Sequence, residues 1–233
     1  MNRPERASQA AFCVHQEPGW LLLNFTRRQR MVSWSISHPG FRDADQIALV
    51  QVRNSDLTPD VDAAAFLRGR LEEKYVPNAV GLMTSGELRY QPVTAVRDGV
   101  AATCVMTLGL SNAERVGQRI AQPRLSKSRL GTINMVCHLS VPLADAALLE
   151  ALSIATQART VAIVDCRYER VPHGGVITGT GTDCIVACCP LGVPREPFAG
   201  LHTAVGEALG AAVLEATRRA MRYWIRNYHD PNA

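Results

Sequence analysis

The sequence predicts an α+β fold: a mixed, largely antiparallel sheet covered by helices, with one crossover unit and a long C-terminal helix. Three observations predict this class. Two apolar runs flank Asp98-Gly99, a pair that favours the tight turn of a β-hairpin. A strand, helix, strand order in the second half indicates one crossover with a locally parallel pair of strands. Helical periodicity then runs from Ala199 to about Tyr228.

Length and composition indicate one globular unit. The chain has 233 residues, of which 47% are hydrophobic and 20% charged, so it can bury a sizeable core. No Pro/Ser-rich linker or charge run divides it, and we therefore predict a single domain over residues 1–233. Residues 1–19 are polar and irregular, which predicts a loosely ordered N-terminus. The folded part is expected over residues 20–228.

The first third of the chain predicts three strands and a helix. Trp20–Phe25 and Met31–Ile36 are apolar strand candidates, and the basic run Arg27–Arg30 between them suits a hairpin loop. Ile47–Val52 is a third strand candidate. Asp60–Tyr75 has apolar residues at helical spacing, and its first residue is a suitable N-cap.

The middle of the chain predicts a hairpin and a surface loop. Val80–Ser85 reads as a short strand that ends in hydroxyl side chains. Leu88–Arg97 and Val100–Leu108 are the two strands of the hairpin. Ala121–Arg129 is basic, interrupted by proline and without periodicity, so we expect a mobile surface loop there.

The second half supplies the predicted crossover. Met135–Val141 is a strand, Asp145–Ala158 is a helix with alanine and leucine on one side, and Val161–Cys166 is a second strand. A buried strand is predicted at Cys184–Cys189, ahead of the long final helix. No tandem repeat is present.

Thr178–Asp183 is the densest polar motif, with two glycines, three hydroxyls and one carboxylate directly before a buried strand. Glycine at such a position lets the backbone approach a ligand or adopt a positive φ angle. The hydroxyls and Asp183 would then lie at the mouth of a sheet. The alternative is a turn that leads into a core strand, with Asp183 bonded to its own backbone.

Polar groups end other apolar segments in the same way. They are Thr84, Ser85, Ser111, Asn112, Thr132 and Asn134. The final helix opens with His202 and Gly206, which share a helical face, and Glu207 is adjacent. Glycine inside a helix costs about 1 kcal/mol relative to alanine, so close packing or a bound ligand is expected to offset it.

Amide hydrolysis needs an activated nucleophile, donors for the oxyanion and an acid for the leaving amine. Asp183 can serve as the base or orient one, and His202 can serve as the acid–base group because imidazole titrates near neutral pH. Asn112, Asn134 and the backbone of Gly179–Thr182 can donate hydrogen bonds. The alternatives are a capping or solvated His202 and asparagines that only form turns.

Several protein classes lack support in the sequence. It has no Gly-x-Ser-x-Gly elbow, Walker-type phosphate loop or His-Glu-x-x-His motif. The seven cysteines lie mostly in apolar runs without zinc spacing, so we predict reduced thiols, a cytoplasmic protein and no zinc site. A net charge of +4 does not indicate nucleic acid by itself, and the arginines of the final helix are expected to be solvated. No window of eighteen apolar residues is free of charge, so no membrane span is expected.

Five motifs, taken in order, resemble the adenosylcobinamide amidohydrolase family of cobamide salvage, and together they span most of the chain. The matching segments are Val80–Thr84, Gly109–Ala113 with Gly117, Gly131–Asn134, Thr178–Asp183, and Ala199–Thr203 with Gly206 and Glu207. The sequence departs from the family at Ser37–Gly40, where such proteins tend to carry Asn-Gly-Gly.

The resemblance implies hydrolysis of the amide that links aminopropanol to the corrinoid of adenosylcobinamide, giving adenosylcobyric acid for cobalamin salvage. We accordingly expect an amidohydrolase-like domain with a small-molecule corrinoid substrate, no cofactor or metal site, and no nucleic-acid or membrane partner; homo-oligomerisation stays open. Catalysis is assigned to Asp183 and His202. The expected substrate-binding residues are Thr84, Asn112, Thr132, Asn134, Gly179, Thr180, Gly181, Thr182 and Glu207.

Three alternatives stay open on sequence grounds. The protein could bind or carry a corrinoid without turnover. It could cleave itself before Thr180 or Thr182 to free an N-terminal nucleophile. His173 or His202 could approach the cobalt of the substrate as an axial ligand. All of the site assignments depend on the five motifs converging on one hollow, with Asp183 and His202 facing it together.

Overall fold

The computed structural model describes residues 10–118, 131–169 and 175–228. In chain order the strands are β1 (Phe12–Glu17), β2 (Trp20–Ser33), β3 (Gly40–Gln51), β4 (Val80–Thr84), β5 (Val93–Arg97), β6 (Val100–Leu108), β7 (Ala113–Glu114), β8 (Ile133–Leu139), β9 (Gly179–Thr180) and β10 (Cys184–Pro190). The helices are α1 (Ala63–Glu73), α2 (Asp145–Asp165) and α3 (Ala204–Tyr228), with a 3₁₀ turn at Asn54–Asp56.

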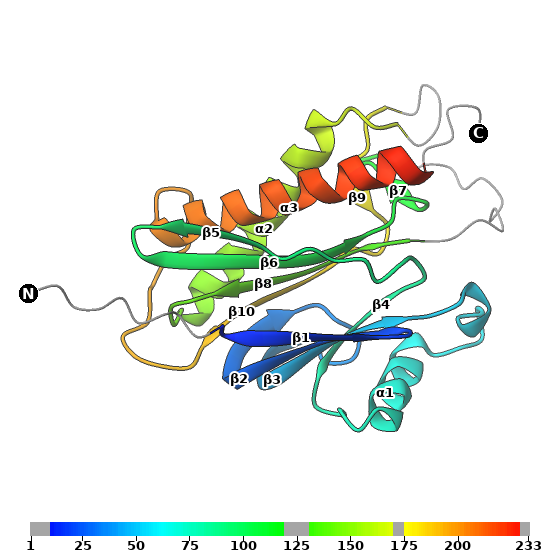
Figure 1. Cartoon of the computed structure of the whole chain (residues 1–233), viewed down its shortest axis with the longest axis horizontal. Helices are drawn as coiled ribbons and strands as arrows, with labels where there is room; N and C mark the ends of the chain where they lie inside the picture. The colour runs from blue at the N-terminus through cyan, green and yellow to red at the C-terminus, as the bar shows by residue number, and fades with distance from the viewer. Residues whose placement is uncertain (1–9, 119–130, 170–174, 229–233) are drawn as a thin grey trace, which may run out of the picture.

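One eight-stranded sheet bends so that its two halves face each other (Figure 1). The strand order is β4–β3–β2–β10–β8–β6–β5, and β1 pairs with β2. We call β1–β4 the first leaf and β10, β8, β6 and β5 the second leaf. Most neighbouring strands are antiparallel, and β3–β4 and β8–β10 are parallel. The predicted α+β class with a mixed sheet and a long C-terminal helix is confirmed.

β2 joins the two leaves because its start pairs with β1 while its end pairs with β10. Its register with β3 shifts between Asn24 and Gln29, which marks a bulge. The prediction of two strands joined by a hairpin loop at Arg27–Arg30 is therefore wrong, since this basic run lies within one strand. The expectation of a loosely ordered N-terminus is also wrong for Phe12–Glu17, which forms β1 on the edge of β2.

Three apolar clusters hold the layers together. The cluster between the leaves joins Leu21 and Leu49 of the first leaf to Val136 and Val186 of the second. A larger cluster packs α2 and α3 on the outer face of the second leaf. The third packs α1 on the outer face of the first leaf through Leu67 and Leu71. The order of layers is thus two helices, second leaf, first leaf and one helix (Figure 1).

Two crossover connections fix the direction of the parallel strands. α2 links β8 to β10, which confirms the predicted crossover, but its second strand is β10 and not Val161–Cys166. Those residues continue α2, because a short apolar run fits a helix as well as a strand. α1 links β3 to β4 in a second crossover that we did not predict.

The local capping and turn signals have mixed outcomes. α1 is capped by Asp62, whose side chain accepts from the amides of Ala64 and Ala65, and the predicted cap at Asp60 is wrong. The predicted turn at Asp98-Gly99 is confirmed, with φ angles of 45° and 79°. The predicted loop Ala121–Arg129 lies outside the described residues.

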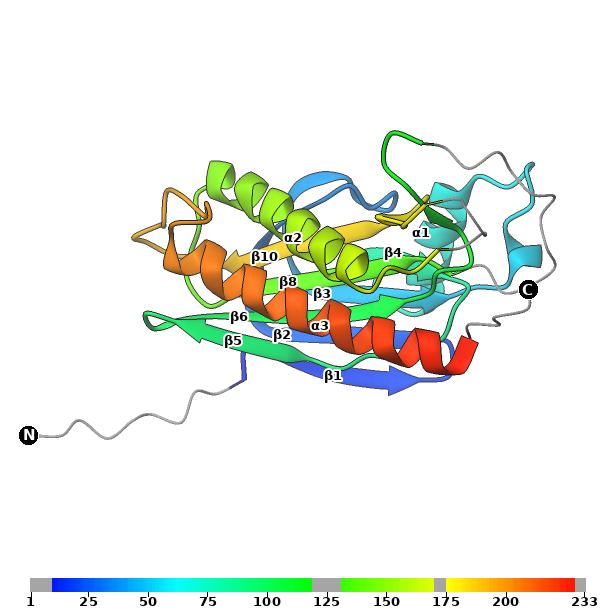
Figure 2. The same cartoon turned by 90° about the horizontal axis from the view of Figure 1, so that it is seen from above.

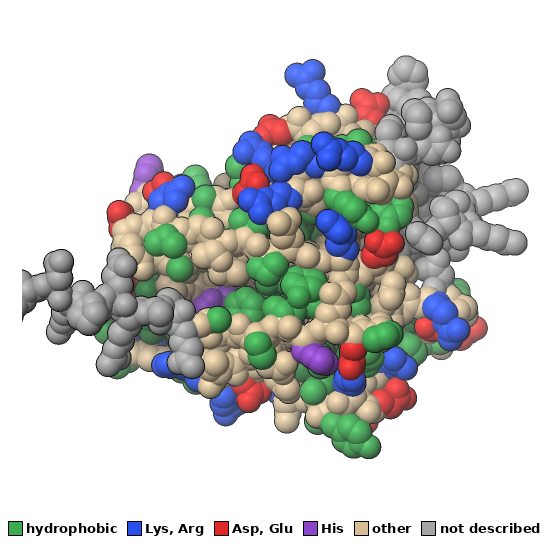
Figure 3. All heavy atoms as spheres, in the orientation of Figure 1, with side chains coloured by type: hydrophobic (Ala, Val, Ile, Leu, Met, Phe, Trp, Pro, Cys, Tyr) green, Lys and Arg blue, Asp and Glu red, His purple; other side chains and the backbone are tan. Residues whose placement is uncertain are grey.

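α2 and α3 lie side by side over the second leaf (Figure 2). α2 is long and apolar enough to cross a membrane, but half of its apolar window is buried inside the protein. Basic side chains gather over α3 on the face shown in Figure 3. Within α3, Arg219 pairs with Glu215, and Arg218 pairs with Asp165 of α2.

Candidate active site

A cavity of about 520 Å³ lies at one end of the sheet, and both leaves contribute to it. Its apolar wall comes mainly from the first leaf and α1: Val52, Leu57, Ala63, Leu67, Leu82 and Met83. Its polar wall comes from the second leaf and the loops that enter it: Asn112, Thr132, Asn134, Gly181, Thr182 and Asp183. Ser35, Arg53, Thr84 and Ser85 also line the first-leaf side, so the cavity sets a polar wall against a wall that is mainly, but not wholly, apolar.

Two glycines cross where the polar wall is assembled. A Cβ atom on Gly109 would lie 2.7 Å from Cα of Gly131, and one on Gly131 would lie 2.5 Å from Cα of Gly109. The amide of Gly109 also donates to the carbonyl of Thr132 at 3.0 Å. This contact brings the loop that carries Asn112 next to the start of β8, and only glycine on both segments permits it.

Threonine hydroxyls from two distant segments meet on the polar wall. The Thr182 hydroxyl donates to Thr132 Oγ1 at 2.9 Å, and the Asn112 side chain donates to Thr182 Oγ1 at 3.0 Å. The hydroxyls of Thr132 and Thr180 are 3.2 Å apart, and the hydroxyl of Thr180 donates to Asp183 Oδ1. One continuous hydrogen-bonded series therefore leads from Asn112 to the Asp183 carboxylate.

The Asp183 carboxylate is held by a buried arginine. Arg159 Nη1 donates to Asp183 Oδ2 at 2.5 Å, and each side chain is only 10% exposed. The backbone amide of Thr180 also donates to Asp183, as the local-turn alternative anticipated. Burial raises the pKa of the Asp183 carboxyl above its ordinary value, while Arg159 and Thr180 act in the opposite direction.

Gly179 makes room for this ion pair. A Cβ atom at position 179 would lie 2.5 Å from Asp183 Oδ2 and 3.3 Å from Arg159 Nη2. The glycine at position 179 of the Thr178–Asp183 motif is thus explained by the approach of an ion pair to the backbone. Neither Gly179 nor Thr180 lines the cavity directly, and both lie behind the polar wall.

Arg159 was missed by sequence reasoning. The signal was a single arginine among buried alanines on one face of α2, which includes Ala151, Ala155, Ala158 and Ala162. We ended the helix at Ala158, and this boundary hid the pattern. A charged residue on the apolar face of a helix needs a buried partner, and Asp183 is that partner.

Two further residues tie the walls together. Asn134 is buried, and its side chain donates to the carbonyl of Met83 at 2.9 Å, which links the second leaf to β4. Trp34 was not predicted; it lines the cavity, is 45% exposed, and donates from its indole nitrogen to the carbonyl of Asp183 at 2.8 Å. Thr84, at the end of β4, lines the cavity and accepts from the amide of Gly86 at 3.0 Å.

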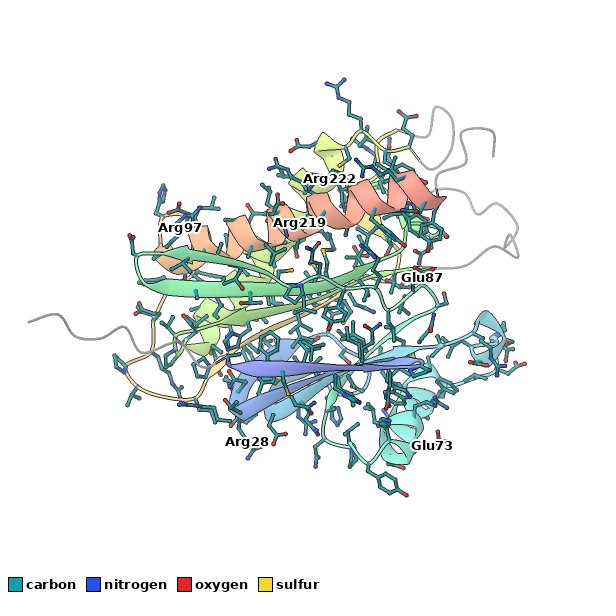
Figure 4. All side chains as sticks on the ribbon, viewed as in Figure 1. Arg28, Glu73, Glu87, Arg97, Arg219 and Arg222 are labelled. Carbon is teal, nitrogen blue, oxygen red and sulfur yellow. The ribbon has the colours of Figure 1, made fainter. Side chains whose placement is uncertain are left out.

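His202 and Glu207 lie at the other end of the sheet. Glu207 pairs with Arg97 at 2.7 Å, beside the β5–β6 turn, whereas Gly109 follows the opposite end of β6. With eight steps of about 3.4 Å along β6, these ends are roughly 27 Å apart. Figure 4 shows Arg97 near the start of α3 and Glu87, which follows β4, near its far end. The expectation that Asp183 and His202 share a hollow is therefore wrong.

The glycine of this fifth motif has a packing explanation. A Cβ atom on Gly206 would lie 2.2 Å from the carbonyl oxygen of Gly200, so the first turn of α3 packs directly on the preceding backbone. The Thr203 hydroxyl accepts from the amide of Gly206 at 3.0 Å and thereby caps the helix. His202 is exposed beside this cap.

Seven of the predicted site residues thus line one cavity. They are Thr84, Asn112, Thr132, Asn134, Gly181, Thr182 and Asp183. Within residues 10–118, 131–169 and 175–228, no group of three or more His, Cys, Asp or Glu side chains is arranged to hold a metal ion. His173, considered as a cobalt ligand, lies outside the described residues.

Comparisons with known proteins agree with the resemblance in the motifs. A family model described as adenosylcobinamide amidohydrolase matches residues 4–228. An uncharacterized protein of Methanocaldococcus jannaschii is 31% identical over 96 residues, which cover 41% of this chain and 37% of that protein. Proteins named adenosylcobinamide amidohydrolase are similar as well: one from Halobacterium salinarum at 29% identity (42% of this chain, 39% of that protein) and one from Methanosarcina mazei at 24% (67% and 73%). The first two matches thus span less than half of each relative.

Proposed function

The chain belongs to the adenosylcobinamide amidohydrolase family, and on that premise we propose that it hydrolyses the amide linking aminopropanol to adenosylcobinamide, giving adenosylcobyric acid for cobalamin salvage. The observation that carries the proposal is the two-sided cavity, with hydroxyl and amide groups on one wall and a mainly apolar surface on the other. A corrinoid has the same two characters, because a large apolar ring system carries polar amide arms.

The size of the cavity suits one arm of such a substrate. Ligand sites typically measure about 300–1,000 Å³, and this one measures about 520 Å³. A whole adenosylcobinamide is larger, so the aminopropanol arm would enter while the macrocycle stays at the mouth. Trp34 is half-exposed at this cavity, and its indole is fixed by the Asp183 carbonyl, which suits contact with a flat ring.

The polar wall offers groups that match an amide. Asn112 lines the cavity, and its side-chain amide donates to Thr182 Oγ1, so it holds that hydroxyl in place beside a bound substrate. Asp183 supplies a base within the same hydrogen-bonded series. His202 has no role in this proposal because it does not line the cavity.

Turnover of the named substrate is the direct test. Purified protein incubated with adenosylcobinamide should release aminopropanol and adenosylcobyric acid in equal amounts, separated by reversed-phase chromatography. Asn112→Ala should lower kcat/KM by at least about 10-fold, because it removes a polar group of the cavity wall. Glu207→Gln, at the far end of the sheet, is the matched control and should leave kcat/KM unchanged. Absence of product from the wild-type protein would reject the proposal.

A corrinoid carrier without turnover is the second candidate function. The cavity supports it equally well, because binding needs the two walls and no chemistry. A change in the visible spectrum of adenosylcobinamide on addition of protein, without release of aminopropanol over many hours, would select this alternative.

A further inference from the structure

The hydrogen bonds of the polar wall run in one direction. Asn112 donates to Thr182 Oγ1, so the hydroxyl hydrogen of Thr182 is directed elsewhere, and it is donated to Thr132. The Thr180 hydroxyl donates to Asp183, so the contact between Thr132 and Thr180 is completed by the hydrogen of Thr132. Each hydroxyl therefore points its hydrogen toward the next acceptor, and the series ends at a carboxylate.

The other end of the series is open to a ligand. Thr182 is exposed and lines the cavity, whereas Thr132 is buried at 6% exposure. Thr180 does not line the cavity, and Asp183 has its carboxylate turned toward Arg159. Thr182 is therefore the hydroxyl of this series with the freest access to a bound amide.

We propose that Thr182 is the nucleophile of the proposed hydrolysis and that its proton passes through Thr132 and Thr180 to Asp183. The inference rests on the proposed function. Thr182 Oγ1 forms a bond to the amide carbonyl carbon, and the hydroxyl proton moves along the series to the carboxylate. The carbon–nitrogen bond then breaks, the proton returns to the leaving aminopropanol nitrogen, and an ester on Thr182 remains. Water hydrolyses that ester, which restores the Thr182 hydroxyl and releases the corrinoid acid.

The surroundings of Asp183 suit a proton acceptor at the end of such a series. Burial raises the pKa of Asp183, and a base works best when its pKa approaches the working pH. Arg159 Nη1 holds Asp183 Oδ2 at 2.5 Å, and this contact fixes the carboxylate so that Oδ1 accepts from the Thr180 hydroxyl. Arg159 is in this scheme a positioning residue, since it contacts the carboxylate and does not line the cavity.

Substitutions of the hydroxyls separate this scheme from direct attack by water. Thr182→Ala should lower kcat at least 100-fold, and Thr182→Ser, which restores a hydroxyl, should recover turnover to within about 10-fold of wild type. Thr132→Val keeps the shape and removes the relay hydroxyl, and it should lower kcat at least 10-fold. Circular dichroism and thermal melting check that each variant folds.

The covalent intermediate gives a second, independent readout. Wild-type protein quenched with acid during turnover should carry an added mass equal to the corrinoid acyl group, located on the peptide that contains Thr182. The same experiment on Thr182→Ala should show no adduct. The mass of the unmodified protein also reveals whether the chain has been cleaved before Thr180 or Thr182, and an adduct on a cleaved chain would overturn the proposal in this form.

The outcomes separate the inference from the proposed function. If wild-type protein makes product and Thr182→Ala does so at a similar rate, the nucleophile assignment is wrong while the proposed function stands. An adduct on Thr132 would have the same meaning. If wild-type protein makes no product, both proposals fail. Turnover that is lost in Thr182→Ala and restored in Thr182→Ser, together with an adduct on Thr182, supports the inference.

Discussion

The two ends of the sheet carry similar motifs with different uses. At the cavity end, glycines 109, 131 and 179 sit beside hydroxyls and a carboxylate, and they let the loops and an ion pair come close together. At the far end, Gly206 sits beside His202, Thr203 and Glu207, and it lets the first turn of α3 pack on the preceding backbone. The polar groups of the first end line the cavity of about 520 Å³, and His202, Thr203 and Glu207 are not among the residues that line it.

The difference shows how a glycine-and-hydroxyl motif should be interpreted. A glycine in such a motif indicates that another group packs closely against the backbone, and the identity of that group shows whether the motif builds a site or a packing contact. Where an ion pair and a second glycine loop approach, polar groups from distant segments are gathered together. Where the chain's own carbonyl approaches, the result is a helix start with exposed polar side chains.

The largest expected contrast between the ends is catalytic. Asp183→Asn keeps the shape of the side chain but removes the base, and it should lower kcat for aminopropanol release by about 100-fold or more. His202→Gln alters an exposed residue outside the cavity, and turnover should stay within roughly twofold of wild type. Steady-state kinetics on both variants measures the contrast. A loss of similar size in His202→Gln would place chemistry at the far end and break the comparison.

The choice of asparagine at position 183 matters. Asp183→Ala would leave the Arg159 guanidinium buried without a partner, and its effect on turnover would be mixed with an effect on folding. Asparagine keeps an acceptor oxygen for Arg159. Thermal melting of Asp183→Asn should therefore show a folded protein.

The second contrast concerns the ion pairs at the two ends. Arg159→Met removes the partner of a buried carboxylate and should cost about 3–5 kcal/mol of unfolding free energy. Glu207→Gln breaks the Arg97 pair, whose side chains are 42% and 60% exposed, and should cost under about 1 kcal/mol. Urea unfolding of both variants at neutral pH measures the two values. Equal losses of unfolding free energy would mean that the buried Arg159–Asp183 pair stabilises the fold no more than the exposed Arg97–Glu207 pair.

The smallest expected effect is a pH dependence of stability. It arises from His138, which lies near the end of β8 that is farther from the cavity. His138 is buried against the rings of Phe12 and Phe25, whose centroids are each 5.7 Å from its own, and burial lowers its pKa to about 4. The unfolded chain takes up this proton near pH 6.5, so the folded state loses stability as pH falls from 6.5 toward 4, by about 3 kcal/mol in total. Urea unfolding at pH 7.5 and 4.5 should show most of this loss.

Two variants assign that pH dependence. His138→Leu should flatten the pH dependence of stability. His15→Gln, which replaces an exposed histidine, should leave that pH dependence unchanged. The measured quantity is the difference in unfolding free energy between the two pH values, which is independent of any packing cost of the leucine. A pH dependence that persists in His138→Leu would assign it to another group.

The sequence predicted most of the polar wall because glycine, threonine and asparagine are gathered at the ends of several apolar segments. Asn112, Thr132 and Thr182 were found in this way, although they lie far apart in the chain. Arg159 was not found, since a helix boundary placed too early concealed a lone charge on an apolar face. His202 was assigned to the site because a motif shows which residues are adjacent in sequence but not which end of a sheet they reach.

The fold was predictable in class and less so in arrangement. The turn at Asp98-Gly99 and the helix α3 have strong local signals, and both are present. The bend that forms two leaves depends on β2 continuing through a bulge at the basic run, and alternation on either side of that run predicts two strands equally well. Pairing between distant strands has no local signal at all.

The pairing of β2 with β10 also determines when, during synthesis, the two leaves can come together. The Ser33 hydroxyl donates to the carbonyl of Ile185, 152 residues further along. During synthesis the first leaf therefore leaves the ribosome long before β10. Its apolar face, which includes Leu21 and Leu49, stays exposed to solvent until the second leaf has been made. In the nascent chain, this exposed apolar face of the first leaf is the surface that a chaperone would bind.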